Sequence, residues 1–447
     1  MNQEIIFAPS TAVGGAICIF RLSGKGCQDL VQPLYLTQNK KTRSTFDRNY
    51  LYYGFLQDPV SERIIDEIYL VFFQENKSYT GEEMVEIHCH GSKAILTSLS
   101  DLFHSLGARS AQAGEFTKRA FFNGRIGLSQ AEAVQELIDA ETSAQSQIAL
   151  NQLSGELKST IQNLRDQIVD FGAHLEATLD YPEEDIDELD NDALYKPIYD
   201  SITKLSLLER SYQRYEIQRE GIRLVISGIP NSGKSSLLNA LLKRDRAIVT
   251  DIAGTTRDHL EESFFYKGIK YVLVDTAGLR DASDEVERIG ISKALELEQE
   301  AHINLYIYDG SKDFEFRESS NTCLHLINKC DLYSADKYSD LENCVQISAQ
   351  KQIGLDDLLN GIHNLALTFI TQENNDIPII TSKRQQKSIS EANSSLTQFI
   401  NSLEGGVPLD IALVEMYEAI DFLSEITGEI ATEDIIDRIF EKFCIGK

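Results

Sequence analysis

A glycine-rich loop between a strand-like run and a helix-like run carries the clearest chemistry in this chain. The loop reads GIPNSGKS over residues 228–235, follows the mostly apolar IRLVIS and precedes LLNALL. Gly228 and Gly233 let the backbone turn its N–H groups toward phosphate oxygens. Lys234 can then neutralise the β- and γ-phosphates, and Ser235 can bind Mg²⁺ through its hydroxyl. This context favours a nucleoside triphosphate site over a glycine turn beside a solvated lysine.

Further motifs follow in the order used by GTP-binding proteins: GTTRD (254–258), DTAG (275–278), NKCD (328–331) and SAQ (348–350). Asp331 selects the base, because its carboxylate can accept two hydrogen bonds from the ring N–H and the exocyclic amine of guanine. Adenine presents an acceptor at that place and would leave the carboxylate unpaired. The motif set therefore predicts a GTPase and not a general ATPase.

The remaining motif residues are predicted to hold the phosphates, the metal ion and the base. Thr256 can reach Mg²⁺ and the γ-phosphate, Asp275 can hold Mg²⁺ through water, and the N–H of Gly278 can face the γ-phosphate. Asn328 and Lys329 brace the base-binding loop. The predicted Mg²⁺ ligands are Ser235 and Thr256. The predicted GTP-binding residues are Asn231, Ser232, Gly233, Lys234, Ser235, Ser236, Thr250, Asp251, Ile252, Ala253, Gly254, Thr255, Thr256, Asp275, Thr276, Ala277, Gly278, Asn328, Lys329, Asp331, Ser348 and Ala349.

The position after DTAG departs from the Ras pattern. Ras-like GTPases carry a glutamine there that orients the attacking water, whereas this chain has Leu279. A leucine side chain forms no hydrogen bond, so another group must orient the water. The segment that follows offers these charged candidates: Arg280, Asp284, Glu285, Glu287 and Arg288.

The composition is that of a multidomain protein with ample apolar content. The chain has 447 residues, a net charge of −28 and 42% hydrophobic residues, which suggests about two to four domains. Seven cysteines without a C-x-x-C pair, and the lack of a secretory pattern, predict a reducing, cytoplasmic location. No apolar run approaches the ~18 residues that span a membrane, so no membrane contact is expected. The acidic balance argues against non-specific coating of nucleic acid but leaves RNA open as a substrate.

Hydrophobic periodicity divides the chain into segments. Residues 1–119 alternate as strands do and predict an α+β domain. Residues 220–370 carry the nucleotide motifs and predict a Ras-like α/β P-loop domain. This domain is inserted between two parts of an all-α domain, 120–219 and 371–447. The expected fold class is therefore multidomain, with one α+β, one all-α and one inserted α/β domain.

The helical part opens with an S-x-x-E pattern. Ser129 and Glu132 are predicted to form a capping box at a helix N-terminus. A heptad-like apolar seam is then predicted to run without a break. Its members are Leu150, Leu153, Leu157, Ile161, Leu164, Ile168, Phe171 and Leu175.

Glu86, His88 and His90 alternate along one predicted strand and leave the same face of it. This set is similar to a two-histidine, one-carboxylate iron site. Because all three residues come from a single strand, ordinary sheet packing is the favoured interpretation, and the metal site is the alternative.

The whole chain resembles the MnmE (TrmE) family of tRNA-modification GTPases. The matching stretches are TGEE, AGEFTKRAFFNGR, LSQAEAV, GIPNSGKSSLLNAL, DIAGTTRD, DTAGLRDASDEVERIGI, LSEITGE and the terminal FCIGK. The resemblance implies a homodimer that works with the flavoprotein MnmG, as a heterotetramer, on the wobble uridine of certain tRNAs. Carbon five of that uridine receives a carboxymethylaminomethyl or aminomethyl group. 5-Formyltetrahydrofolate or a related tetrahydrofolate supplies the one-carbon unit.

The resemblance also implies roles for particular residues. By position, the folate contacts are Arg21, Glu86, Arg125 and Lys447, which moves Glu86 away from metal binding. A K⁺ site replaces the arginine finger of other GTPases, and it is expected on Asn231, Thr250, Ile252 and Thr255. The implied catalytic residues are Glu287, which orients the water, together with Lys234 and Asn231.

Two departures from the family pattern stand out. Gln350 replaces the lysine usual after SA, and little effect is expected because that loop contacts guanine mainly through its backbone. The segment between Gly278 and Asn328 is short for the family, so partner contacts there are not carried over. Two alternatives remain: a GTP-dependent switch that senses folate status, and a ribosome-assembly GTPase. The latter explains neither residues 1–119 nor the FCIGK tail.

Replacing Asp331 with Asn tests the predicted base recognition. An amide donates where the carboxylate accepts, so Asp331→Asn should shift the preference from GTP toward xanthosine triphosphate. Competition binding of the two nucleotides measures this shift. A variant that still prefers GTP would contradict the assignment of Asp331.

Overall fold

The computed structural model describes residues 4–180, 191–244, 261–274, 297–317, 322–338, 344–370, 377–430 and 432–446. The chain divides into two compact units, which are described separately. The first unit contains Met1–Asp139, Ala149–Thr203 and Lys387–Lys447, and the second contains Ala140–Ile148 and Lys204–Gln386. The predicted multidomain fold, with an N-terminal α+β part, a helical part and a P-loop α/β part, is confirmed, while the four domain boundaries stay a prediction.

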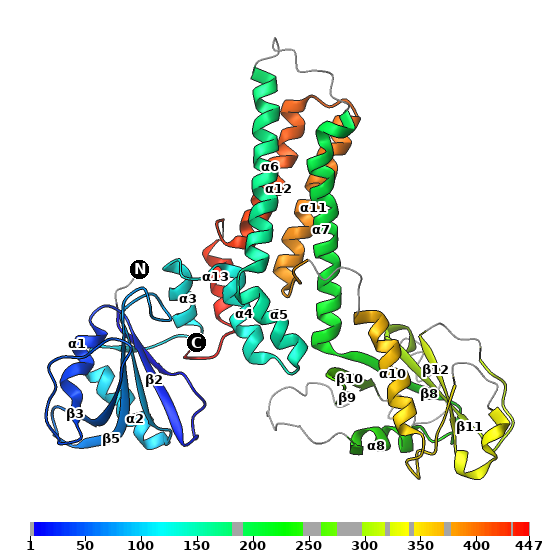
Figure 1. The fold of residues 1–447 in the computed structure, drawn as a ribbon, viewed down its shortest axis with the longest axis horizontal. Helices are drawn as coiled ribbons and strands as arrows, with labels where there is room; N and C mark the ends of the chain where they lie inside the picture. Colours follow the sequence, from blue (N-terminus) through cyan, green and yellow to red (C-terminus); the bar gives the residue numbers. More distant parts are fainter. Residues whose placement is uncertain are drawn as a thin grey trace, which may run out of the picture. The chain divides into compact units, whose positions relative to one another are not determined.

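A mixed sheet forms the N-terminal part of the first unit (Figure 1). Its strand order is β3-β4-β5-β6-β2-β1-β7, antiparallel except for the β1–β7 pair. The strands are β1 (Ile6–Pro9), β2 (Ile17–Ser23), β3 (Tyr35–Thr37), β4 (Leu51–Gln57), β5 (Ile64–Phe73), β6 (Met84–His90) and β7 (Arg109–Ser110).

One face of this sheet is apolar and the other is polar, as the alternating sequence predicts. The apolar face packs on α1 (Cys27–Val31) and α2 (Lys93–Ser105). Phe20 of β2 stacks on Phe103 of α2, with ring centroids 5.7 Å apart. Arg21 neighbours Phe20 along β2, so its side chain leaves the opposite, polar face of the sheet.

The helical part of the first unit is built around the pair α6 (Glu156–Asp180) and α12 (Leu409–Thr427), which lie side by side (Figure 1). Gly172 of α6 faces Met416 of α12, and a Cβ atom there would stand 2.3 Å from Cε, the flexible end of the methionine side chain. The other helices are α3 (Glu115–Phe122), α4 (Leu128–Asp139), α5 (Ser143–Leu153), α7 (Asn191–Glu220), α11 (Lys383–Glu404) and α13 (Glu433–Phe440), of which α5, α7 and α11 extend into the second unit.

Two local predictions for this part were wrong. Ser129 lies inside α4 instead of capping it, and Gln130 does the capping by accepting a 2.8 Å hydrogen bond from the N–H of Gly127. The apolar seam is also interrupted, because Gly155 adopts a φ of 91° between α5 and α6. Leu150, on the α5 side of the break, is 44% exposed.

The second unit contains a sheet with the strand order β13-β12-β11-β8-β10-β9. All pairs are parallel except β9 with β10. Its core packs on α8 (Lys234–Arg244) and α10 (Leu355–Ile370). The strands are β8 (Ile222–Gly228), β9 (Glu261–Tyr266), β10 (Ile269–Val274), β11 (Ile303–Asp309), β12 (Cys323–Asn328) and β13 (Cys344–Gln346).

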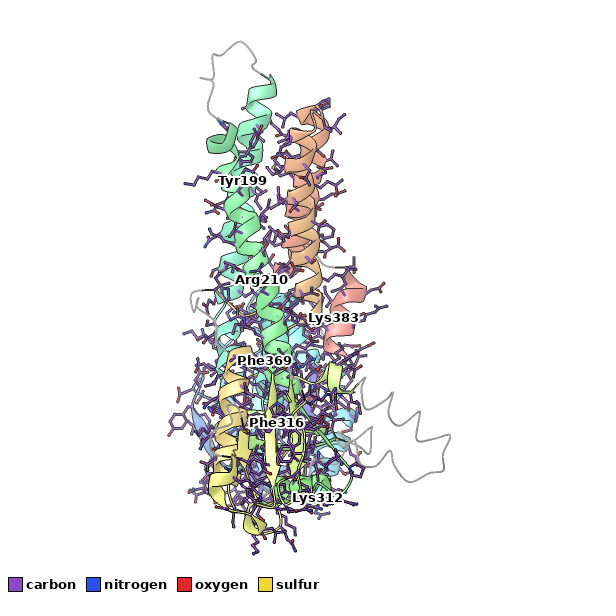
Figure 2. All side chains as sticks on the ribbon, turned by 90° about the vertical axis from the view of Figure 1, so that its right-hand side faces the viewer. Tyr199, Arg210, Lys312, Phe316, Phe369 and Lys383 are labelled. Atoms are coloured by element: carbon purple, nitrogen blue, oxygen red, sulfur yellow. The ribbon has the colours of Figure 1, made fainter. Side chains whose placement is uncertain are left out.

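The described part of the short segment after β11 packs aromatic side chains against that strand. Residues 310–317 form no helix. Phe314 stacks on Tyr308 with ring centroids 4.5 Å apart. The ring centroid of Phe316, which is labelled in Figure 2, lies 5.0 Å from that of Tyr308. The Tyr308 hydroxyl and Nδ1 of His325 share a 3.1 Å hydrogen bond. Two phenylalanine rings thus cover the face of the sheet from which the Tyr308 side chain of β11 projects.

None of the helices in the described part of the chain has both the length and the hydropathy needed to cross a membrane.

Because the seam is interrupted, replacing leucine with alanine should change the free energy of unfolding by different amounts at two of its positions. Leu164 is 2% exposed on α6, so Leu164→Ala should lower the free energy of unfolding by about 2–5 kcal/mol. Leu150→Ala, at the half-exposed position, should cost under about 1 kcal/mol. Urea denaturation followed by circular dichroism measures both. Equal losses would support the unbroken seam.

Candidate functional site

The phosphate-binding loop between β8 and α8 adopts the left-handed backbone that its glycines allow. Gly228 and Gly233 have φ angles of 137° and 103°, and Asn231 lies in the same region at 63°. A Cβ atom on Gly228 would stand 2.3 Å from the carbonyl oxygen of Ile307. One on Gly233 would stand 2.2 Å from Nδ2 of Asn328. Both space and φ therefore require glycine at these positions.

Lys234 begins α8 and directs its ammonium group back across the loop. Its Nζ donates to the carbonyl oxygens of Gly228 (3.0 Å) and Ile229 (2.8 Å). Ser235 and Ser236 are exposed at the same helix N-terminus, where backbone N–H groups lack acceptors within the helix. A cation, two hydroxyls and helix N–H donors thus meet at one end of α8, which suits phosphate and Mg²⁺.

Asn328 joins this loop to the base-recognition loops. Its Nδ2 donates to the carbonyl oxygen of Ser232 at 2.7 Å, and its Oδ1 accepts from the N–H of Ala349 at 3.0 Å. Asn328 ends β12 and is only 3% exposed. Because both ends of the amide are engaged, one buried side chain fixes the spacing between the phosphate loop and the SAQ loop.

Lys329 is held by a residue outside the predicted motifs. Its backbone is left-handed at a φ of 66°, and its Nζ lies 2.6 Å from Oδ2 of Asp309. Burial favours a raised pKa for Asp309, but hydrogen bonds from Lys329 and Ser311 outweigh it and hold the pKa below its ordinary value. Asp309 ends β11. Its place at the carboxyl end of a parallel strand is a signal that could have found it from sequence.

The carboxylate of Asp331 has two neighbours that donate to it. A hydrogen bond from the Ser348 hydroxyl lowers the pKa of Asp331, partial burial opposes this, and Lys351 lowers the pKa further. Nζ of Lys351 lies 3.2 Å from Oδ2 of Asp331. The carboxylate is therefore ionised at neutral pH and acts as an acceptor, as guanine recognition requires.

A second polar cluster lies on the polar face of the N-terminal sheet. Arg21 and Glu86 are directly opposite each other on β2 and β6. Nε and Nη2 of Arg21 donate to Oε1 of Glu86 at 3.0 and 2.8 Å. Nε2 of His88 lies 3.6 Å from Oε2 of Glu86. Burial favours a raised pKa for Glu86, but His88 and Arg21 together lower it below its ordinary value.

The ring of Tyr79 brings two of the predicted arginines together. The guanidinium carbons of Arg21 and Arg125 lie 5.2 and 5.4 Å from its centroid. Nη1 of Arg125 also donates to the Tyr79 carbonyl oxygen, and the Tyr79 hydroxyl shares a 2.8 Å hydrogen bond with Thr117. Sequence reasoning missed Tyr79, since an aromatic residue in a loop has no spacing that marks it.

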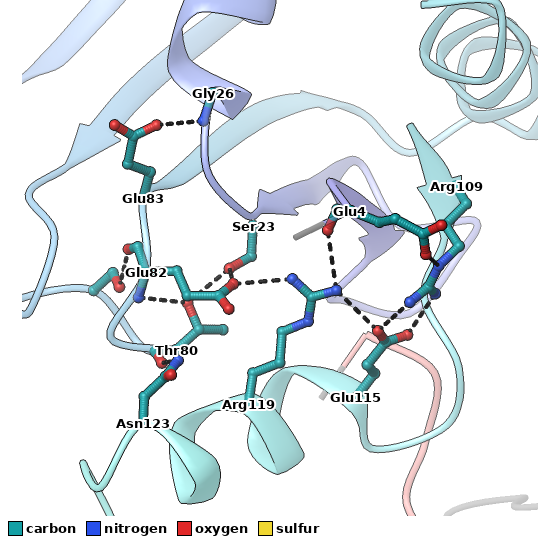
Figure 3. Close-up of polar contacts among 11 residues, drawn as sticks. Glu4, Ser23, Gly26, Thr80, Glu82, Glu83, Arg109, Glu115, Arg119 and Asn123 are labelled. Atoms are coloured by element: carbon teal, nitrogen blue, oxygen red, sulfur yellow. Dashed lines mark hydrogen bonds and ion pairs between the residues drawn. The ribbon is translucent and has the colours of Figure 1, made fainter. Parts of the chain in front are cut away.

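Buried charges fix the loop that carries Tyr79 against α3 (Figure 3). Arg119 donates to Glu82 and to Glu115, both at 3.0 Å. Glu115 also accepts from Arg109 at 2.6 Å. The Arg119 side chain is only 9% exposed, so its charge requires these partners. The network therefore fixes the first turns of α3 against the loop, and Arg125 comes three residues after the end of this helix.

The C-terminal tail reaches the same part of the first unit. Ile445 forms an antiparallel bridge with Ala113, just before α3. Gly446 has a φ of 95°, and a Cβ atom there would stand 2.1 Å from the carbonyl oxygen of Pro9. The tail thus packs closely against the end of β1. Lys447 follows immediately but lies outside the described residues.

Two of the three residues of the alternative iron site are paired with residues outside it. His90 Nδ1 lies 2.8 Å from Asp66 Oδ1, while Glu86 is bound by Arg21. No group of three His, Cys, Asp or Glu side chains suited to a metal ion occurs within the described ranges.

Comparisons with known proteins point to one family along the full length of this chain. A family model described as the MnmE helical domain matches residues 128–444, and one described as the GTP-binding protein TrmE N-terminus matches residues 5–125. The tRNA modification GTPases MnmE of Natranaerobius thermophilus and Aquifex aeolicus are 39% and 40% identical to this chain, with all of each chain covered. That of Clostridioides difficile is 38% identical, over 100% of this chain and 99% of its own. The chain belongs to the MnmE (TrmE) family.

The described residues of this MnmE family member account for part of the predicted sites. The edge of the second sheet brings together Asn231 to Ser236, Asn328, Lys329, Asp331, Ser348 and Ala349. The Tyr79 ring brings Arg125 next to Arg21, which is paired with Glu86 on the first sheet. The predicted residues Thr250 to Thr256, Asp275 to Gly278, Glu287 and Lys447 lie outside the described residues. The roles assigned to all of these residues stay predictions.

Proposed function

We propose that this chain is a potassium-activated GTPase that, with the flavoprotein MnmG, modifies carbon five of the wobble uridine in certain tRNAs. The added group is carboxymethylaminomethyl or aminomethyl, and a tetrahydrofolate such as 5-formyltetrahydrofolate supplies the one-carbon unit. Membership of a family whose curated relatives are named tRNA modification GTPases supports tRNA as the substrate. The observation that carries GTP binding is the Asn328 amide, which links the phosphate loop to the SAQ loop beside Asp331.

Four of the described residues are given specific tasks in binding or hydrolysis. Lys234 moves from the loop carbonyls to the β- and γ-phosphates, where it offsets developing charge. Asp331 accepts from guanine, and Asn328 holds the two loops in place. The exposed hydroxyl of Ser235 fits a Mg²⁺ ligand, with Thr256 as its partner. Magnesium supplies charge neutralisation between the phosphates.

Potassium fits the loop at Asn231, whose exposed side chain can offer its amide oxygen. Thr250, Ile252 and Thr255 are proposed to complete the site. The ion supplies the positive charge that an arginine finger supplies elsewhere. Glu287 is proposed to orient the attacking water in place of Leu279.

The Tyr79 cluster is proposed to hold the folate. Two guanidinium groups on one aromatic ring offer a cationic surface to glutamate carboxylates. The ionised Glu86 can accept hydrogen bonds from the N–H groups of a pterin. Lys447 is proposed to add a further cation from the tail, which packs beside β1. The N-terminal domain is proposed as the homodimer contact, with MnmG completing a heterotetramer.

Potassium dependence is the decisive test of the proposed mechanism. GTP hydrolysis is measured on the purified full chain in equimolar KCl and NaCl. A potassium advantage is expected, bounded by the about 10³–10⁵ that an arginine finger contributes. Equal slow rates would overturn the potassium site and favour the folate-sensing switch.

Glu287→Ala is the control for this experiment. The variant should bind nucleotide normally and show no turnover in either salt, because the water is no longer oriented. Normal turnover would remove Glu287 from the mechanism.

The tRNA role is tested by mass spectrometry of the wobble uridine in a strain that lacks the gene. An unchanged nucleoside in that strain would contradict the role.

Tyr79→Leu tests the folate cluster. Loss of the ring removes both cation–π contacts, each worth about 0.5–1 kcal/mol, so affinity for 5-formyltetrahydrofolate should fall about fivefold to thirtyfold. Tyr79→Phe keeps the ring, loses only the bond to Thr117, and should bind nearly as wild type does. Calorimetric titration measures both, with GDP affinity as the fold control. Unchanged folate affinity in Tyr79→Leu would contradict the role of the ring.

A further inference from the structure

Lys351, which is outside the predicted motifs, forms an ion pair with the carboxylate that is proposed to recognise guanine. Nζ of Lys351 is 3.2 Å from Oδ2 of Asp331, and the Asp331 side chain is only 13% exposed. A recognition carboxylate must present both oxygens to the base edge. At least one group that now covers Asp331 must therefore move when guanine binds.

Lys351 is the group that can move. Its side chain is 60% exposed, whereas Ser348, the other donor to Asp331, is 1% exposed. A lysine side chain on the surface is a flexible stem with a strongly hydrated end, so leaving the carboxylate costs it little. Ser348 is fixed within the loop and can keep its hydrogen bond while the base binds.

The backbone around Lys351 aims it at this carboxylate. Ser348 and Ile353 exchange reciprocal N–H to carbonyl hydrogen bonds of 3.0 and 3.1 Å, which close a tight loop. The N–H of Lys351 also donates to the Ser348 hydroxyl at 3.3 Å. Gln352 has a φ of 57°, a left-handed turn that follows directly. The lysine therefore starts from a fixed point beside Asp331.

We propose that Lys351 competes with guanine for Asp331 and thereby lowers the affinity of the GTPase domain for guanine nucleotides. The inference rests on the proposed recognition of guanine by Asp331. Every binding event must first break an ion pair, and every release restores it, which favours exchange of product for substrate. Gln350 leaves the position after SA without a charge, and Lys351 places one a residue later, where it meets the carboxylate.

Lys351→Met is the test, because it keeps an unbranched stem and removes only the charge. GDP is titrated calorimetrically into the full chain, and the variant should bind about twofold to fivefold more tightly, the range of an exposed ion pair. The sign is decisive, since loss of a cation near an anionic ligand would otherwise weaken binding. Lys243→Met, which removes an exposed cation at the far end of α8, is the matched control and should show no gain.

Two further measurements distinguish competition for Asp331 from a general effect of the lysine charge on nucleotide affinity. In the Asp331→Asn background the amide forms no ion pair, so Lys351→Met should leave affinity for xanthosine diphosphate unchanged. The gain for GDP should also shrink from about 0.05 M to about 0.5 M NaCl, because salt screens an exposed pair. Unchanged or weaker GDP binding by Lys351→Met would overturn the inference. Failure of the wild-type chain to bind GDP would instead overturn the proposed function.

Discussion

The buried amide of Asn328 is the interaction on which the nucleotide site depends. One side chain donates to Ser232 in the phosphate loop and accepts from Ala349 in the base loop. The two loops are far apart in sequence, and only the parallel order of β8, β11 and β12 brings their ends to one edge. Glycine at 233 follows from the same contact, because a Cβ atom there would collide with the amide. The motif glycine and the motif asparagine are thus required by each other as well as by the ligand.

The N-terminal cluster obeys a different constraint, the pairing of buried charge. Arg119 is almost enclosed, and its partners Glu82 and Glu115 come from a loop and from its own helix. Breaking one pair would leave an uncompensated charge, so the loop and α3 are held together. Tyr79 precedes Glu82 in the loop and Arg125 follows α3, so the network fixes both segments that bring Arg125 to the Tyr79 ring.

Residue type and spacing predicted the family and the fold class correctly, because phosphate and base recognition impose local patterns. The roles of the individual site residues stay predictions. The patterns did not reveal partners supplied by tertiary structure. Asp309 and Lys351 meet Lys329 and Asp331 only through strand order and a closed loop. Sequence patterns for helix ends also failed where two neighbouring residues could each cap the helix. Ser129 has the cap signature, yet Gln130 reaches the Gly127 N–H and α4 begins two residues earlier than the signature implies. The seam broke at Gly155, whose left-handed φ outweighs the apolar spacing around it.

The two sites use the same chemical pair in opposite ways. Glu86 is held by an arginine through two N–H donors, and both side chains are mostly buried. A planar guanidinium that is always charged makes such a pair a lasting part of the fold. Asp331 is instead paired with a lysine that is largely in solvent. An exposed ammonium group exchanges readily with water or with a competing donor, and its bond is worth little. The choice of cation therefore separates a carboxylate that is held firmly in place from one whose partner can leave.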